Sequence, residues 1–168
     1  MKLKLGKARI FIMLLAVGFL PNAALSTGVD QRAPLFSVQN ILSGKQLALK
    51  HFRGQVVYLD FWASWCKPCL KSFPFMEQLA QKYGDRGLVV IAVGLDENPD
   101  DLMSFLNQVE PASFFIAHNR KGDIAVSYDV QVMPSTYLIG RDGRIKLRHL
   151  GFDSRDKEKL EKIIERHL

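Results

Sequence analysis

The sequence predicts an α/β domain in which helices flank a mixed β-sheet. Runs of β-branched and aromatic residues alternate with segments whose apolar residues recur every three or four positions, which is typical of alternating strands and helices. Two strand-like runs near the C-terminus enclose Asp142-Gly143, a dipeptide that favours a tight hairpin turn. An amphipathic segment then closes the chain. Together these observations favour a sheet with both parallel and antiparallel strands.

The first half of the domain contains the clearest strand. Residues 56–62, VVYLDFW, are almost entirely apolar, which predicts a central strand covered on both faces. Before it, residues 36–39 and 46–49 flank the turn signal Ser43-Gly44 and predict a short β-hairpin. After it, six apolar or aromatic residues at helical spacing predict a helix that ends at Gly84: Leu70, Phe73, Met76, Leu79, Ala80 and Tyr83.

The second half continues the alternation. Residues 88–93 predict a second buried strand. Asn98-Pro99-Asp100-Asp101 combines a cap residue, a proline at the first helical position and acids near the positive end of the helix dipole, so a helix should run from there to residue 109. The remaining expected elements are a strand at 113–116, a short helix at 121–128, strands at 135–139 and 145–149, and a helix after Asp153-Ser154.

Composition and charge exclude several classes of protein. The 168 residues suit one domain, and the 48% hydrophobic and 24% charged fractions are those of a soluble globular protein rather than a disordered one. The net charge of +6 depends on four basic residues within the first nine positions, and no basic stripe follows, so nucleic-acid binding is not expected. Two cysteines are too few for a disulfide scaffold.

Residues 1–26 have the pattern of a secretory signal peptide. A basic start precedes the apolar run IFIMLLAVGFL at residues 10–20, and Ala24-Leu25-Ser26 offers a cleavage site after Ser26. The run is well short of the ~20 residues that a permanent membrane-spanning helix needs. We therefore expect export and cleavage, with contact to the membrane only if the segment is kept as an anchor.

The motif Cys66-Lys67-Pro68-Cys69 carries the predicted chemistry, because it lies where the central strand gives way to a helix. Free N–H groups and the dipole at a helix N-terminus favour a thiolate, and Lys67 adds a positive charge. Pro68 is tolerated in the first helical turn. The spacing lets the two sulfurs meet across one turn. We expect Cys66, at the exposed end, to be the nucleophile and Cys69, further in, to be the resolving thiol.

Three other interpretations of the cysteine pair compete with redox catalysis. A structural disulfide that closes four residues would contribute only about 2 kcal/mol in the chain-entropy model. Structural zinc needs four ligands, and the histidines at positions 51, 118, 149 and 167 lack the required spacing. The main alternative function is a carrier that holds copper or another metal through the two thiols.

The motifs resemble those of thioredoxin-fold oxidoreductases. DFWASWCKPC is similar to their active-site signature, Pro74 matches the proline inside their first helix, and Met133-Pro134 resembles their cis-proline segment. The likeness covers residues 34–168. The signal segment, the early hairpin and the helix near 98–109 further resemble the periplasmic TlpA/ResA-like branch. This implies a thioredoxin-like mixed sheet flanked by helices, with an N-terminal β-hairpin and a central helical insertion.

The resemblance also implies roles for individual residues. Cys66 and Cys69 would be the catalytic pair, working without cofactor or metal. Pro134, if its peptide bond is cis, would lie against the disulfide and help to hold a substrate chain; the alternative is a proline that only begins a strand. Trp62 and Trp65 would shield the disulfide, although an aromatic residue in such a strand is also typical of a core. The expected substrate contacts are Trp65, Lys67, Pro68 and Met133.

Two acids complete the candidate site. Asp60 is the only charged residue in the central strand, where a carboxylate is costly unless it is paired or used. It matches the buried acid that relays the proton of the second cysteine in cytoplasmic thioredoxins, whereas many TlpA-like proteins have a neutral amide there; the alternative is that Asp60 faces solvent. Glu97 falls where ResA-like proteins place an acid, but the adjacent Asp96 blurs the register, and a solvated loop acid fits equally well.

The resulting functional prediction is a periplasmic enzyme that reduces disulfides of exported proteins through a mixed disulfide at Cys66, for example during cytochrome c maturation. The implied partners are protein thiols and disulfides, together with a membrane thiol reductase as electron donor. The direction of electron flow depends on the reduction potentials of this cysteine pair and of its partners.

Overall fold

A five-stranded sheet organises the computed structural model, which describes residues 28–111 and 113–168. Its order is β5-β4-β3-β6-β7. Strands β3, β4 and β5 are parallel, and β6 and β7 add antiparallel pairs on the other side, so the predicted mixed sheet is confirmed. The strands are β3 (Val56–Trp62), β4 (Leu88–Gly94), β5 (Phe115–His118), β6 (Ser135–Ile139) and β7 (Ile145–Leu150).

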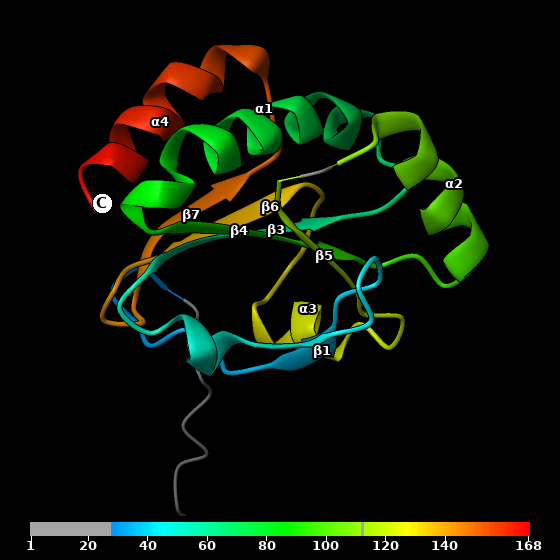
Figure 1. Ribbon diagram of the computed structural model, residues 1–168, viewed down its shortest axis with the longest axis horizontal. Helices are drawn as coiled ribbons and strands as arrows, with labels where there is room; N and C mark the ends of the chain where they lie inside the picture. The colour runs from blue at the N-terminus through cyan, green and yellow to red at the C-terminus, as the bar shows by residue number, and fades with distance from the viewer. Residues whose placement is uncertain (1–27, 112) are drawn as a thin grey trace, which may run out of the picture.

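Helices and a hairpin cover the two faces of this sheet (Figure 1). On one face lie α1 (Lys67–Tyr83), α2 (Pro99–Val109) and α4 (Lys157–Glu165). On the other lie α3 (Asp123–Ser127) and the expected hairpin of β1 (Ser37–Gln39) and β2 (Gln46–Ala48). Three 3₁₀ turns complete the elements: η1 (Leu49–Phe52), η2 (Gly84–Arg86) and η3 (Ser154–Asp156).

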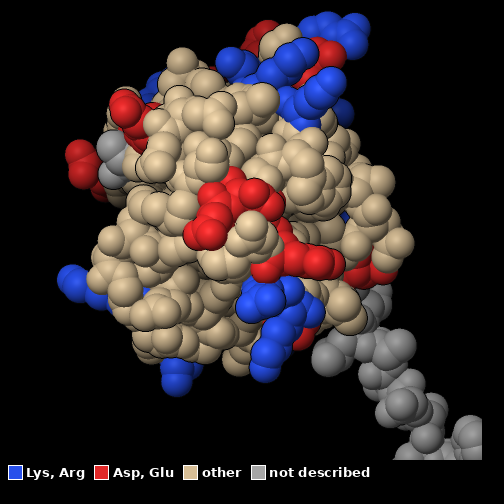
Figure 2. All heavy atoms as spheres, turned by 90° about the vertical axis from the view of Figure 1, so that its right-hand side faces the viewer, with Lys and Arg blue, Asp and Glu red and all other residues tan. Residues whose placement is uncertain are grey.

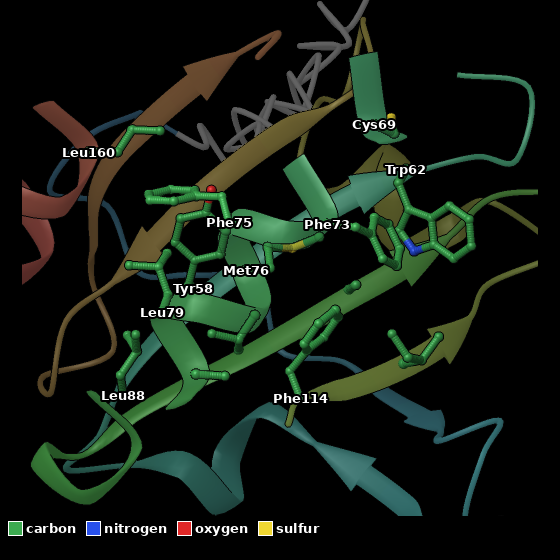
Figure 3. Close-up of a cluster of buried hydrophobic side chains, with 14 of the residues drawn as sticks. Tyr58, Trp62, Cys69, Phe73, Phe75, Met76, Leu79, Leu88, Phe114 and Leu160 are labelled. Atoms are coloured by element: carbon green, nitrogen blue, oxygen red, sulfur yellow. The ribbon is translucent and has the colours of Figure 1, made fainter. Parts of the chain in front are cut away.

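The central strand β3 separates two hydrophobic clusters. Successive side chains of a strand point to opposite faces. Tyr58 and Trp62 therefore pack under α1, in the cluster that includes Cys69 and Phe73 (Figure 3). Leu59 and the other odd-numbered residues of β3 join the cluster on the hairpin side. The continuous apolar run in the sequence is the consequence of burial on both faces.

Several predicted boundaries differ from the structure. The strand expected at 113–116 is Phe115–His118, because its register is set by pairing with β4, where Phe115 lies opposite Ile91. The last helix starts at Lys157, after the 3₁₀ turn η3. Helix α1 ends before Gly84 as predicted, but Gly84 has a right-handed φ of −54°, and the left-handed residue is Gly87 with a φ of 90°.

The chain enters the domain at the end of the sheet farthest from α1's first turn. The backbone N–H of Asp30 donates to the Ile145 carbonyl at 2.7 Å, and that of Ala33 donates to the Gly143 carbonyl at 3.0 Å. Ile145 begins β7 opposite Ile139, the last residue of β6, which is the sheet end away from Trp62. The expected signal segment, residues 1–26, lies outside the described residues. In the described part of the chain, no helix is long and apolar enough to cross a membrane.

Candidate active site

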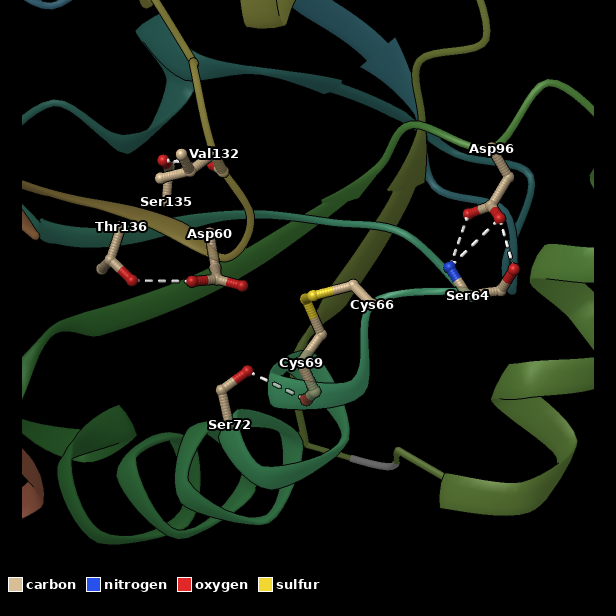
Figure 4. The surroundings of a disulfide bond; sticks show 9 residues. All are labelled: Asp60, Ser64, Cys66, Cys69, Ser72, Asp96, Val132, Ser135 and Thr136. Atoms are coloured by element: carbon tan, nitrogen blue, oxygen red, sulfur yellow. Dashed lines mark hydrogen bonds between the residues drawn. A yellow bond between two sulfur atoms is a disulfide. The ribbon is translucent and has the colours of Figure 1, made fainter. Parts of the chain in front are cut away.

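The two cysteines form a disulfide at the N-terminus of α1 (Figure 4). Cys66 is the N-cap residue, Lys67 and Pro68 occupy the first turn, and the Cα atoms of Cys66 and Cys69 are 5.3 Å apart. Cys66 is 4% exposed and Cys69 is 0% exposed. Cys66 is thus the more exposed of the two cysteines, but in the oxidised protein even Cys66 offers solvent only a small area.

The two tryptophans near the disulfide occupy different environments. Trp62 is fully buried, and its ring lies 4.8 Å from the ring of Phe73 and 4.7 Å from that of Phe105, measured between centroids. Trp65 is 70% exposed. Trp62 therefore belongs to the core beneath the site, whereas Trp65 stands in solvent next to Cys66, where a second protein can reach it.

Asp60 is buried beneath the same end of the sheet, so the interpretation of this residue as a solvent-facing acid is wrong. It is 1% exposed, and Thr136 on β6 donates its hydroxyl hydrogen to Asp60 Oδ1 at 2.7 Å. Burial raises its pKa to about 7, and the Thr136 hydrogen bond opposes part of that rise. Among the described residues, Asp60 Oδ2 has no hydrogen-bond partner.

The strand alternation aims Asp60 at α1. Asp60 points to the same face as Tyr58 and Trp62, and both of these pack in the cluster that contains Cys69. Figure 4 shows its carboxylate between Thr136 and the disulfide. A buried carboxylate whose pKa is near 7 can exchange a proton at physiological pH, which is the property a general base needs.

The Met133-Pro134 segment reaches the same end of the sheet. Its peptide bond is cis, as the predicted role of Pro134 requires. Ser135 pairs with Phe61 on β3, so Pro134 lies at the level of the next strand residue, Trp62. Trp62 in turn comes shortly before Cys66 in the sequence. Met133 is partly buried against the cluster that contains both cysteines. The end of the central strand and the helix start, which are neighbours in the sequence, thus meet the cis-proline segment, which lies far along the chain.

Of the two adjacent loop acids, Asp96 and Glu97, the structure buries Asp96. Asp96, on the loop after β4, is 3% exposed and accepts hydrogen bonds from the Ser64 backbone N–H at 3.1 Å and the Ser64 hydroxyl at 2.5 Å. Glu97, the acid singled out from the sequence, is exposed on the same loop. The register of the parallel strands indicates that Asp96 lies beside Ser64. Trp62 pairs with Gly94, and Ser64 and Asp96 each follow two residues later.

The surface around the disulfide end carries charge of both signs. Figure 2 looks at this end of the molecule and shows acidic side chains gathered in the middle, with basic ones above and below. Helix α2 begins here with Asp100 and Asp101 in its first turn. Within the described residues, no group of three or more His, Cys, Asp or Glu side chains is arranged to hold a metal ion.

Comparison with known proteins yields consistent likenesses. The Redoxin family profile matches residues 28–164. The thiol-disulfide oxidoreductase ResA of Bacillus thuringiensis subsp. konkukian is 34% identical over 166 residues, which cover 94% of each chain. Among solved structures, a candidate thiol:disulfide interchange protein DsbE from Chlorobium tepidum is 44% identical with a TM-score of 0.80, covering 84% of this chain and 99% of the other. The exposed lipoprotein thioredoxin Etrx1 of Streptococcus pneumoniae is 27% identical with a TM-score of 0.68, covering 79% and 99%. These likenesses establish the predicted thioredoxin-like fold.

Proposed function

Because the chain belongs to the Redoxin family and is a thiol–disulfide oxidoreductase, we propose that it works outside the cytoplasm and reduces disulfide bonds of exported proteins. The observation that carries this proposal is the Cys66–Cys69 disulfide at the N-terminus of α1, with the less buried cysteine at the N-cap. A helix N-terminus stabilises the thiolate that attacks a disulfide. No cofactor is needed for such an exchange.

The reaction follows from the positions of the two sulfurs. In the reduced protein, the Cys66 thiolate attacks one sulfur of a client disulfide. The client S–S bond breaks, Cys66 joins the client in a mixed disulfide, and the other client sulfur leaves as a thiolate that takes up a proton. Cys69 then loses its proton and attacks Sγ of Cys66, which releases the client's second thiol and forms the Cys66–Cys69 disulfide. Two electrons pass to the client, and a dithiol donor must return two.

Asp60 serves the second attack rather than the first. Cys66 already has the helix N-terminus and Lys67 to favour its thiolate. Cys69 is fully buried, and burial in apolar surroundings leaves a thiol poorly ionised. The Asp60 carboxylate, on the face that packs against Cys69's cluster, is suited to take the Cys69 proton while the mixed disulfide resolves.

The client chain would bind across the rim of the disulfide. Exposed Trp65 offers an apolar surface on one side, and Met133 with cis-Pro134 borders the other. Lys67 and Pro68, in the first turn of α1, complete the contact area. Glu97, exposed on the loop after β4, would meet only the outer part of a large client.

Location and partners are inferred from the signal pattern and from relatives. The pattern of residues 1–26 favours export to the periplasm, and the exposed lipoprotein thioredoxin of Streptococcus pneumoniae is one relative that works outside the cytoplasm. Clients would be exported proteins with cysteine pairs, such as apocytochrome c. A membrane thiol reductase would supply the electrons, because soluble reductants of the cytosol do not reach that compartment.

A trapping experiment tests the function. With Cys69→Ser, Cys66 can form the mixed disulfide but nothing resolves it, so clients should accumulate on the protein and be released by a reductant. Cys66→Ser is the matched control and should trap nothing. Reduced parent protein should also reduce insulin. A copper carrier makes the opposite forecast: tight Cu(I) binding that needs both thiols, without disulfide turnover. That outcome would refute the proposal.

A further inference from the structure

We propose that Asp96 is a positioning residue for the nucleophile: it fixes the turn that delivers Cys66 to the start of α1. The residues between β3 and α1 form a β-turn, because the Cys66 N–H donates to the Ala63 carbonyl at 3.0 Å. Ser64 and Trp65 are its two central residues. The orientation of this turn sets where Sγ of Cys66 stands relative to the free N–H groups of the helix.

Few side-chain contacts within the described residues hold the two central residues of the turn, Ser64 and Trp65. Trp65 is 70% exposed, so most of its side chain is not packed against the protein. Ser64 is held by Asp96 alone among the side-chain contacts of the described residues, but through two donors, the backbone N–H and the hydroxyl, on one carboxylate (Figure 4). Bonds from a neutral donor to a charged acceptor are stronger than neutral pairs, and two of them define an orientation as well as a distance.

Asp96 is itself rigidly placed. Its side chain is 3% exposed, and its carbonyl accepts a hydrogen bond from Nε2 of His118 at the end of β5, at 2.7 Å. The preceding Leu95 donates its N–H to the Trp62 carbonyl at 2.9 Å. Asp96 therefore ties the Ser64 turn to three neighbouring strands at the point where they end. Through the Asp96 carboxylate, the fixed ends of the strands hold the turn that places Cys66.

The expected slowing of the Cys66 attack follows from how close a group must lie to the helix N-terminus to be influenced by it. The influence of the helix N-terminus falls off within its first turn. A misplacement of about 1 Å in a reacting group can cost up to roughly 10²-fold in rate. Loosening the turn should therefore slow the attack of Cys66 on a small disulfide by about tenfold at neutral pH, and shift the pH midpoint of Cys66 alkylation upward.

The test compares three variants in the reduced full-length mature protein. Asp96→Ala removes both acceptor oxygens and should show the slowed attack and the shifted midpoint. Asp96→Asn keeps one acceptor oxygen without the charge, and should restore the rate to within about threefold of the parent. Asn98→Ala is the matched control: it removes the cap acceptor of α2 on the same loop, which accepts from Asp100 N, whereas the side-chain hydrogen bonds of Ser64 in the described residues go to Asp96.

The rates and midpoints of these variants decide whether Asp96 positions Cys66. A parent-like rate and midpoint in folded Asp96→Ala overturns the proposal. So does an equal change in Asn98→Ala, because the effect would then reflect general loosening of the loop. Asp96→Asn that is as slow as Asp96→Ala shows that charge rather than position matters, and also refutes it. If Asp96→Ala does not fold, Ser64→Ala tests the same contact, with a smaller loss of about threefold expected and an unchanged rate contradicting the proposal.

Discussion

Replacing Asp60 with Asn should stabilise the protein at neutral pH and flatten the pH dependence of its stability. Asp60 is fully buried, and burial raises its pKa from 3.8 to about 7. In the unfolded chain the group titrates near the lower value. Between these two values the folded protein holds a proton that the unfolded chain has lost, so the free energy of unfolding falls as the pH rises.

The size of the effect can be worked from that shift. About three pKa units at ~1.4 kcal/mol each give about 4 kcal/mol of stability lost between about pH 4 and about pH 7. Asn has the same shape and no charge, but its amide hydrogens would replace Oδ2, which has no hydrogen-bond partner among the described residues. Leaving them unpaired costs about 1–3 kcal/mol. The net gain for Asp60→Asn should be about 1–3 kcal/mol at about pH 8, and near zero or negative at about pH 4.

Urea unfolding of the oxidised proteins at these two pH values measures the effect. The parent should be less stable at the higher pH, and the difference should shrink in Asp60→Asn. Glu97→Gln, which neutralises an exposed acid near the same site, is the control and should behave like the parent. A variant whose gain over the parent is the same at both pH values would refute the reasoning, since the gain would then not come from the ionisation of Asp60.

Three further predictions follow from the site, the core and the N-terminus. Asp60→Asn should leave alkylation of Cys66 nearly unchanged but slow client release from the mixed disulfide by roughly 10²–10⁴-fold in single-turnover assays, the usual contribution of a general base. Gly94→Ala should lower the free energy of unfolding by about 1–3 kcal/mol in urea, because overpacking strains a core and the new Cβ would lie 2.3 Å from Cδ1 of buried Leu102. Protein from its natural compartment should have an intact mass that begins at Thr27, the residue after the expected cleavage site.

Each of these predictions can fail in a specific way. Equal release rates in Asp60→Asn and the parent would make Asp60 an ordinary buried acid of the strand. Unchanged stability in Gly94→Ala would mean that Leu102 can move aside. A mass that still includes residues 1–26 would contradict cleavage, and recovery from the cytosol would contradict export.

The parts of the fold that local sequence determines were predictable. Strand β3 matches its predicted bounds because burial on both faces leaves a continuous apolar run. Helix α2 begins where its cap pattern indicates, and Asn98 does accept a hydrogen bond from Asp100 N. Strand β5 was misplaced by two residues, because pairing with β4 and not its own residues sets where it begins.

In the site, too, some residues can be predicted from local sequence and others only from the pairing of strands. Cys66 and Cys69 were found because their spacing and their place at a helix start are local features. Asp96 could not be separated from Glu97, since nothing near them in the sequence distinguishes two adjacent loop acids. Which of them turns inward depends on Ser64, whose position is 32 residues away and becomes visible only once β3 and β4 are in register.

The place where the chain enters the domain determines which end of the enzyme faces solution when its N-terminal side is attached to a surface. Asp30 and Ala33 lie at the end of the sheet opposite the disulfide. Strand β3 spans seven residues between the two ends, which at ~3.3 Å per residue is about 20 Å. A surface attached at residue 28 itself, whether a bilayer, a bead or an electrode, would therefore leave the Cys66 end pointing into solution. A reductase fixed in that same surface would have to extend its own cysteines about that far to reach it.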